Sequence, residues 1–340
     1  MYEILDTPRA PLTDAHGRVV RYLRLSVTDR CNLRCLYCDS NARTQSIPHN
    51  VVLRYEEMLQ IVDLATTLGV HKVRLTGGEP FARKGFAHFL EMLRSAHPDL
   101  DIRITTNATL VRPHVSLLRA VGITAMNISL DSFHPSRFAR ITGRELLPEV
   151  RATIDALLDA GIPLKINAVA LRGYTDTELP AFVNFVRQHP VDVRFIEFMP
   201  MGADSQWSEK YFWPAAEILE KLQKIAPLHL CQEDPSVHGP ARMYTMDGAK
   251  GRIGLITPLS NHFCFSCNRL RVTSDGRLRT CLFADREYNL LPALRHEKLG
   301  PDFLRRIFMA ANVRKPIGVD ILRKRGSAPV SHRHMVGIGG

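Results

Sequence analysis

Short runs of apolar and β-branched residues alternate with longer amphipathic stretches from about Val19 onward. The stretch 54–68 shows the helical pattern well, because its apolar residues recur on one face and Gly69 ends it. The runs predict strands at 20–27, 71–76, 101–106, 124–130, 163–170 and 192–198, and helices near 54–68, 86–96, 113–121, 148–160, 176–188 and 214–225. Repeated strand–helix pairs are typical of a parallel sheet that is either closed into a barrel or doubly wound.

Polar residues follow several of these strands directly. The segments concerned are Thr76-Gly77-Gly78-Glu79-Pro80, Thr105-Thr106-Asn107, Ser129-Leu130-Asp131-Ser132 and Met199-Pro200. Any one of them could be an ordinary turn. Together they favour a common site at the carboxyl-end rim of a parallel barrel, where active sites of such barrels lie.

Three cysteines follow the first predicted strand at a C-x3-C-x2-C spacing, namely Cys31, Cys35 and Cys38. No fourth cysteine is nearby. Three thiolates leave one iron of a cubane iron–sulfur cluster free, and an open coordination position is typical of a catalytic metal site. Spacing alone also leaves structural thiols and a zinc site open, although structural zinc prefers four ligands.

A second cysteine group contains Cys264, Cys267 and Cys281. The first two form a C-x2-C pair, and a hairpin predicted over 270–279 returns Cys281 beside them. This group again has three thiolates. His262 is a candidate fourth ligand, so a structural zinc ribbon remains an alternative to a second cluster.

The strand–helix rhythm ends near residue 226, and residues 231–250 are polar and rich in turn residues. Cys231 has no motif around it and is expected to be a small buried residue. Helices are expected at about 291–296 and 300–312, followed by a basic, flexible, glycine-rich tail that ends in Gly339-Gly340.

Composition narrows the class of protein. The 340 residues are 45% hydrophobic, which suffices for one large α/β domain with a smaller addition. The net charge of +11 suits an anionic partner such as nucleic acid, a nucleotide polyphosphate or an acidic surface. We expect no signal peptide and no membrane span, since no apolar run approaches ~20 residues. Seven cysteines in such a chain then predict reduced, metal-binding thiols in the cytoplasm.

These motifs together resemble known ones. The first cysteine triad, with Tyr37 before its last cysteine, resembles the radical S-adenosylmethionine (SAM) signature, and Gly77-Gly78-Glu79-Pro80 resembles the Gly-Gly-Glu-Pro motif of that superfamily. A closer resemblance, from about residue 10 to the end, is to the GTP 3′,8-cyclase family of molybdenum cofactor biosynthesis. It rests on the segments 23–32, 74–80, 194–199, 254–257, 264–271 and 281–283 and on the final Gly-Gly pair.

The resemblance implies a fold and its organisation. The fold would be α/β, an incomplete (βα)6 barrel of the TIM type found in radical SAM enzymes. The expected parts are a lead-in over 1–18, the partial barrel over 19–226, and a C-terminal region over 227–340 that covers the open side of the barrel.

The resemblance also implies site residues. Cys31, Cys35 and Cys38 would hold one [4Fe–4S] cluster, and Cys264, Cys267 and Cys281 would hold a second one. The SAM pocket would be lined by Tyr37, Gly78, Ser129 and Met199. GTP would be bound by Arg24, Arg74, Thr105, Lys165, Arg269, Leu270 and Arg271. Gly339 and Gly340 would enter the active site and assist catalysis. For each cation taken alone, a salt bridge remains the alternative to a substrate contact.

The implied activity is a radical cyclisation. In this family the free iron of the first cluster chelates SAM, and that of the second contacts guanine. The 5′-deoxyadenosyl radical takes hydrogen from C3′ of GTP, and the sugar radical attacks carbon 8 to give 3′,8-cyclo-7,8-dihydro-GTP. Implied partners are a flavodoxin- or ferredoxin-type reductant, cyclic pyranopterin monophosphate synthase as recipient of the product, and a second copy in a homodimer. Neither nucleic acid nor a membrane is an expected partner.

The sequence departs from the family pattern at three places. Asp39 follows Cys38 where Met or Leu is usual, Ala108 follows Asn107 where Gly is usual, and no aromatic residue precedes Ile338. None of the six cluster cysteines is missing.

Two other classes compete with this interpretation. Another radical SAM enzyme with an auxiliary cluster, such as a peptide-modifying one, usually has more C-terminal cysteines. A zinc-dependent nucleic-acid binder fits the positive charge, but it explains neither the barrel rhythm nor the Gly-Gly-Glu-Pro segment.

Overall fold

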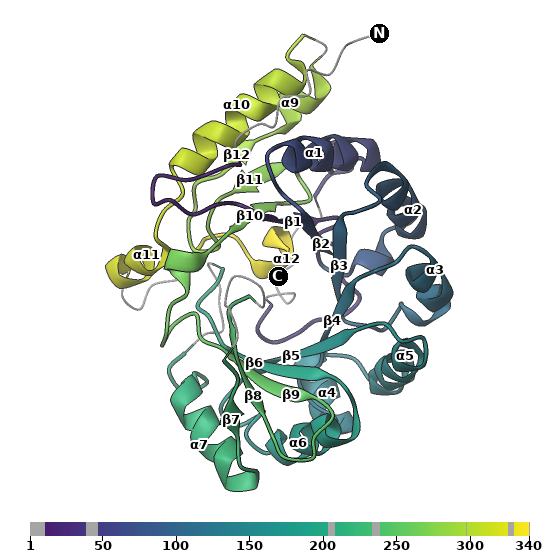
Figure 1. Cartoon of the computed structure of the whole chain (residues 1–340), viewed down its shortest axis with the longest axis vertical. Helices are drawn as coiled ribbons and strands as arrows, with labels where there is room; N and C mark the ends of the chain where they lie inside the picture. Colours follow the sequence, from purple (N-terminus) through teal and green to yellow (C-terminus); the bar gives the residue numbers. More distant parts are fainter. Residues whose placement is uncertain are drawn as a thin grey trace.

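A partial barrel of parallel strands forms the centre of the molecule (Figure 1). The computed structural model describes residues 11–38, 47–202, 208–232, 239–296, 298–325 and 330–339. The barrel strands pair in sequence order and are β1 (Tyr22–Ser26), β2 (Lys72–Thr76), β3 (Asp101–Thr106), β4 (Ala125–Ser129), β5 (Leu164–Ala170) and β6 (Asp192–Glu197). The outer layer consists of α1 (Tyr55–Thr67), α2 (Phe86–Ala96), α3 (Val115–Ala120), α4 (Pro135–Thr142), α5 (Leu147–Asp159), α6 (Leu179–Gln188) and α7 (Ala215–Ile225). The expected α/β fold, an incomplete barrel of parallel strands covered by helices, is confirmed.

Side chains of each strand alternate between the core under the helices and the barrel interior. In β1, Leu23 and Leu25 are fully buried in the main hydrophobic cluster. Tyr22, Arg24 and Ser26 therefore face the interior. The same alternation in β2 buries Val73 and Leu75 outward and turns the polar residues between them inward. The interior is consequently polar and rich in arginine.

The C-terminal region extends the barrel sheet at both edges. Strand β9 (Arg252–Ile256) pairs parallel with β6, and β10 (Arg269–Val272) pairs parallel with β1. Antiparallel strands follow outside them: β8 (Ala241–Thr245) and β7 (His229–Leu230) beyond β9, and β11 (Arg277–Arg279) and β12 (Tyr288–Asn289) beyond β10. The C-terminal region therefore borders the open side of the barrel from two directions.

The strand–helix rhythm ends near residue 226, as expected, but the segment 231–250 also contains a strand that was not expected. This strand, β8, was missed because the sequence of its segment is polar: only Met243 and Tyr244 of its five residues are buried. Helix α4 was also not expected. Pro135 starts it at the first helical position, and Gly143 ends it in the left-handed conformation, so a short helix fits between two turn residues.

In the described residues of the tail, helices and buried contacts are found where the composition indicated a flexible segment. The remaining helices are α9 (Leu291–Arg295), α10 (Gly300–Val313), α11 (Gly318–Arg325) and α12 (Met335–Ile338). Ile338 of α12 is buried with Met201, Phe283 and Val330 in a second hydrophobic cluster. These contacts supply the burial that a tail needs to become ordered.

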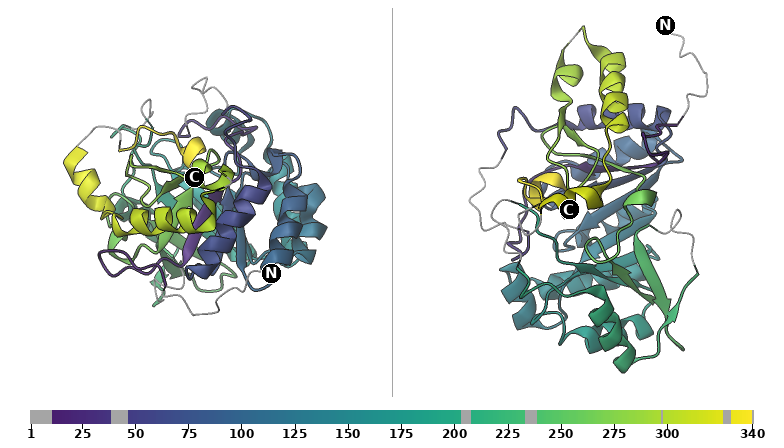
Figure 2. Two further views of the ribbon diagram at one scale, coloured as in Figure 1. Left: turned by 90° about the horizontal axis from the view of Figure 1, so that it is seen from above. Right: turned by 90° about the vertical axis from the view of Figure 1, so that its left-hand side faces the viewer.

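The C-terminal end lies near the centre of the molecule in each view of Figures 1 and 2. Helices α9 and α10 project beyond the barrel at one end of the long axis (Figure 2). Among the described residues, no helix is long and apolar enough to cross a membrane.

Candidate active site

The first cysteine triad lies in the loop that follows β1, and the Gly-Gly-Glu-Pro segment holds this loop in place. The backbone N–H of Gly78 donates to the Thr28 carbonyl at 2.7 Å, and that of Glu79 donates to the Arg30 carbonyl at 2.7 Å. A β-carbon on Gly78 would lie 2.2 Å from the carbonyl oxygen of Arg30. Only glycine permits so close an approach of the two backbones.

A polar network ties the same cysteine loop to the end of β3. The Glu79 carboxylate is buried and accepts from the Asn107 N–H at 2.7 Å and from the Thr106 hydroxyl at 2.8 Å. The side-chain nitrogen of Asn107, Nδ2, lies 2.9 Å from Asn32 Oδ1 and 3.7 Å from the Cys31 sulfur. The strand-end polar residues thus converge with the cysteines, as the barrel pattern predicted.

The thiols of the first triad fit a shared cationic group. Burial, Asp131 and the neighbouring Cys38 and Cys31 raise the pKa of Cys35 well above its usual range. Thiolates that repel one another in this way need positive charge between them, which iron provides. In addition, the Leu33 N–H donates to the Cys31 sulfur at 3.5 Å.

The residues expected around SAM lie close to the first triad or at neighbouring strand ends. The Tyr37 hydroxyl donates to Asp131 Oδ2 at 2.6 Å, and the Val169 N–H donates to the other oxygen of that carboxylate at 2.8 Å. Ser129 is the last residue of β4, and Met199 follows β6 and packs against the second hydrophobic cluster.

The second cysteine triad is brought together as the predicted hairpin required. A β-carbon on Gly318, at the start of α11, would lie 3.1 Å from the Cys281 sulfur and 3.2 Å from that of Cys264. The backbone N–H groups of Gly318 and Val319 point at Cys264. Burial alone would raise the pKa of Cys267, but Lys315 and Arg269 outweigh burial and lower it. A cradle of N–H donors and cations suits thiolates that hold an iron–sulfur cluster.

The zinc alternative fits this geometry less well. Within the described part of the chain, no three His, Cys, Asp or Glu side chains are arranged to hold a single metal ion. Each thiolate of a cubane cluster binds a different iron, so cluster ligands need not converge on one point. The Nδ1 atom of His262, the proposed fourth ligand, lies 2.7 Å from the Pro258 carbonyl oxygen. Cys231 is partly exposed, so the expectation that it is buried was wrong.

Four neighbouring strands present arginines at matched positions in the barrel interior. Arg24 of β1 is paired in register with Arg271 of β10 and with Arg74 of β2, and Arg74 is paired with Arg103 of β3. Like charges placed opposite one another across strands destabilise a sheet. Of these four, Arg103 has a carboxylate partner, Asp101. The layer therefore carries several buried cations that a polyanion would neutralise.

The other residues expected to bind GTP differ in how they are placed. The Thr105 hydroxyl lies 3.5 Å from Arg74 Nη1, and Arg269 starts β10 next to Tyr22. Lys165 faces the interior but forms an ion pair with Asp192 at 2.9 Å, so the salt-bridge alternative describes it. Leu270 is buried in the main core on the opposite face of β10, so only its backbone could reach a ligand in the interior.

The C-terminal tail reaches the interior beside these arginines. Arg271 Nη1 donates to the Gly339 carbonyl at 3.2 Å. A β-carbon on Gly339 would lie 2.8 Å from the Thr76 methyl group and 2.9 Å from the Ser26 β-carbon, and Gly339 has a φ of 78°. Both features require glycine at this position. Gly340 lies outside the described residues, as does Asp39.

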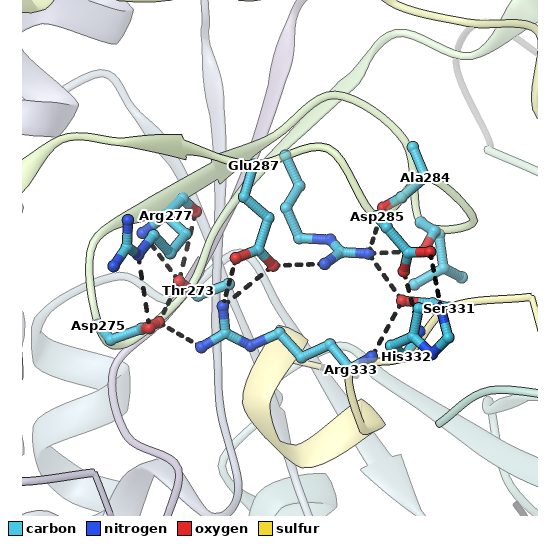
Figure 3. A network of polar contacts seen from close by, with 11 residues as sticks. Thr273, Asp275, Arg277, Ala284, Asp285, Glu287, Ser331, His332 and Arg333 are labelled. Carbon is cyan, nitrogen blue, oxygen red and sulfur yellow. Dashed lines mark hydrogen bonds and ion pairs between the residues drawn. The ribbon is translucent and has the colours of Figure 1, made fainter. Parts of the chain in front are cut away.

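An ion network anchors the tail to the hairpin (Figure 3), and a backbone hydrogen bond joins the tail to the loop after β6. Arg333 pairs with Asp275 at 2.6 Å and with Glu287 at 2.8 Å, and Arg279 donates to the Ser331 hydroxyl at 3.0 Å. On the other side, the Gly202 N–H donates to the Ser331 carbonyl at 2.9 Å.

Sequence reasoning missed two interior residues. Arg194 of β6 is buried, and its Nε and Nη2 atoms have no hydrogen-bond partner among the described residues. Burial, together with the nearby charge of Arg74, lowers the pKa of Arg194 to about 9. Tyr22 lies among the arginines at the start of β1. Side chains two residues apart on a strand lie on the same face, so strand alternation could have identified both residues. Arg194 is two residues from Asp192, and Tyr22 is two residues from Arg24.

Comparisons with known proteins match two family descriptions. Residues 25–186 match the radical SAM superfamily, and residues 191–321 match Molybdenum Cofactor Synthesis C. The fold is similar to that of Streptococcus suis SuiB bound to S-adenosylmethionine, with a TM-score of 0.63 and 14% identity over 95% of this chain and 78% of SuiB. The fold and these matches define the protein as a radical SAM enzyme, a class that uses SAM and a [4Fe–4S] cluster.

Sequence relatives give the particular family. The GTP 3′,8-cyclase of Alkaliphilus oremlandii is 38% identical and aligns over 97% of this chain and 100% of its own length. That of Thermodesulfovibrio yellowstonii is 41% identical over 84% of this chain and 88% of its own. The chain belongs to the GTP 3′,8-cyclase family and thus to the enzymes of molybdenum cofactor biosynthesis.

Proposed function

We propose that this enzyme converts GTP to 3′,8-cyclo-7,8-dihydro-GTP, the first step of molybdopterin formation. The observation that carries the substrate assignment is the arginine layer of β10, β1, β2 and β3, because it provides several buried cations in one enclosed space. A nucleoside triphosphate carries the matching negative charge. The relatives named above carry the same activity in their names.

The first cysteine triad would hold the cluster that serves SAM. When bound, that cluster supplies the electron that splits SAM into methionine and a 5′-deoxyadenosyl radical. Tyr37 and Ser129 would line the SAM pocket, with Tyr37 fixed by Asp131. Gly78 allows the backbone of the Gly-Gly-Glu-Pro segment to lie against the cysteine loop. This packing holds the loop that carries the three cysteines in place.

The second triad would hold an auxiliary [4Fe–4S] cluster. When bound, that cluster offers an open iron to guanine. Arg269 follows Cys267 by two residues and continues into β10, so the same strand would connect the guanine end and the phosphate end of the substrate. Arg24, Arg74 and Arg271 would bind the triphosphate together with Arg194 of β6, on which the charge of Arg74 acts.

The tail would complete the active site. Gly339 lies against Ser26 and Thr76, at the ends of β1 and β2, and its carbonyl accepts from Arg271. We propose that Gly339 and Gly340 exclude water and orient the substrate while the C3′ radical attacks carbon 8. A flavodoxin- or ferredoxin-type protein as reductant, and transfer of the product to cyclic pyranopterin monophosphate synthase, complete the proposal.

The two triads can be tested separately. In Cys35→Ala we expect SAM cleavage to be abolished, because the first cluster loses a ligand. In Cys281→Ala we expect the iron content to fall by about half while 5′-deoxyadenosine still forms without cyclised product. Iron analysis and deoxyadenosine quantification after anaerobic reconstitution provide the measurements. Deoxyadenosine formation at the normal rate in Cys35→Ala would contradict the first assignment, and normal cyclisation in Cys281→Ala would contradict the second.

A further inference from the structure

Tyr22 is the acidic group at the centre of the interior cations. It is paired in register with Lys72 of β2 on one side and with Arg269 of β10 on the other. Arg74 Nε donates to its phenol oxygen at 2.5 Å. Lys72 Nζ and the guanidinium carbons of Arg74 and Arg269 lie 5.9, 5.9 and 6.0 Å from its ring centroid. A phenol among so many cations is an exception to the usual pairing of arginine with a carboxylate.

The surroundings of Tyr22 favour an ionised oxygen. The charged groups that act on it from the strands packed around it are Arg24, Lys72, Arg74, Arg194, Arg269 and Arg271. The nearest carboxylates already have cationic partners: Asp101 pairs with Arg103, and Asp192 pairs with Lys165. Burial alone would raise the pKa of Tyr22, but Arg74, Arg24 and Arg269 outweigh burial and lower it to about 7.

We infer that Tyr22 is a positioning residue that acts as the counter-ion of the arginine layer until a nucleoside triphosphate binds. In the empty site its oxygen neutralises and orders Arg74 and the neighbouring guanidiniums. When the triphosphate arrives, the phosphate takes over the arginines. The tyrosine oxygen then gains one proton from solvent and donates a hydrogen bond to a phosphate oxygen. This inference rests on the proposed binding of GTP.

The exchange gives triphosphate affinity a defined pH dependence. A phosphate beside the oxygen disfavours its ionised form, so the pKa of Tyr22 is higher in the complex than in the free enzyme. Affinity is therefore fully present below the free-enzyme pKa of about 7 and weakens as pH rises above it. One proton taken up corresponds to a loss of affinity of about tenfold for each pH unit.

The test uses the full chain with its clusters reconstituted anaerobically, without SAM or reductant, so that no turnover occurs. GTP binding is measured by titration calorimetry between about pH 6 and about pH 8.5, in buffers of different ionisation enthalpy. The wild type should take up about one proton more at about pH 8 than the Tyr22→Phe variant does. Its affinity should also fall with rising pH more steeply than that of the variant, by up to about tenfold more for each pH unit. Proton exchange by GTP itself is common to both proteins and cancels.

Tyr55→Phe is the matched control. Tyr55 starts α1, on the outer side of the barrel, and burial raises its pKa to about 12, so it stays protonated throughout. This variant should behave as the wild type. The inference is overturned if the wild type binds GTP without proton uptake or pH dependence, a result that does not depend on the folding of any variant. It is also overturned if Tyr22→Phe retains the full proton uptake. Failure of the wild type to bind GTP at any pH would instead refute the proposed function.

Discussion

Individual interior side chains determine which substrate the barrel can accept. Arg24, Arg74 and Arg271 lie at matched positions on adjacent strands, an arrangement that is unfavourable without an anion. Strand alternation predicts how many arginines face the interior, but it does not predict which side chains they pair with. Lys165 has the same pattern in the sequence and yet pairs with Asp192, because the register of β5 and β6 places the two side by side. A sequence does not state such a register.

Arg269→Ala tests the substrate role at this scale. Loss of one charge-assisted contact to substrate costs roughly 1.5–3 kcal/mol, so kcat/KM for GTP should fall by about 10- to 100-fold. The iron content should fall much less than kcat/KM, since the backbone N–H of Arg269 toward Cys267 is retained and Lys315 and Arg18 still act on that thiol. Arg242→Ala is the control, since Arg242 is an exposed residue of β8, and it should leave both quantities unaltered. An unchanged kcat/KM in Arg269→Ala would remove this residue from the proposed GTP site.

At the scale of elements, the segments that the sequence describes best are those with a strong period or a motif. The helix over Tyr55–Thr67 and the six barrel strands were predicted within one or two residues. Strand β8 and helix α12 were missed because each is short and becomes ordered only through tertiary contacts. The conformation of Ala108 likewise could not be predicted from the local sequence. It adopts a positive φ of 65°, where the family usually has glycine, and it is fully buried within the turn after β3.

Arg333→Ala tests the anchor of the tail. The change removes the pairs with Asp275 and Glu287 that hold residues 330–333 to the hairpin. Loss of hydrogen bonds to charged groups costs roughly 1.5–3 kcal/mol, which should dislodge Gly339 from Ser26 and Thr76. We expect 5′-deoxyadenosine to form while cyclised product per deoxyadenosine falls about tenfold or more.

The control for this change is Arg323→Ala, an exposed arginine of α11. It removes the same charge from the same part of the chain without touching the network in Figure 3. The account of the tail is wrong if Arg333→Ala and Arg323→Ala give the same ratio of product to deoxyadenosine as the wild type.

At the scale of the whole molecule, the two cysteine triads are joined through neighbouring strands of the described sheet. The triad after β1 lies at one end of that strand, and Cys264 and Cys267 of the other triad lead into β10, the strand beside it, while Cys281 follows β11. The parallel pairing of β1 with β10 joins chain segments more than two hundred residues apart, and sequence periodicity carries no information on such a pairing. The barrel was thus predictable from the local pattern of the sequence. That pattern did not predict how β9 and β10 extend the edges of the barrel, or where the tail binds.

The central claim is that the barrel interior holds GTP between the two triads, so that a radical formed from SAM beside the first triad takes hydrogen from C3′ and the sugar radical then cyclises. The most direct measurement is anaerobic incubation of the reconstituted enzyme with SAM, GTP and a reductant, followed by identification of the nucleotide product and quantification of 5′-deoxyadenosine. We predict 3′,8-cyclo-7,8-dihydro-GTP with about one deoxyadenosine for each cyclised nucleotide, since each hydrogen abstraction consumes one radical. Deoxyadenosine that accumulates while GTP remains intact would contradict the account.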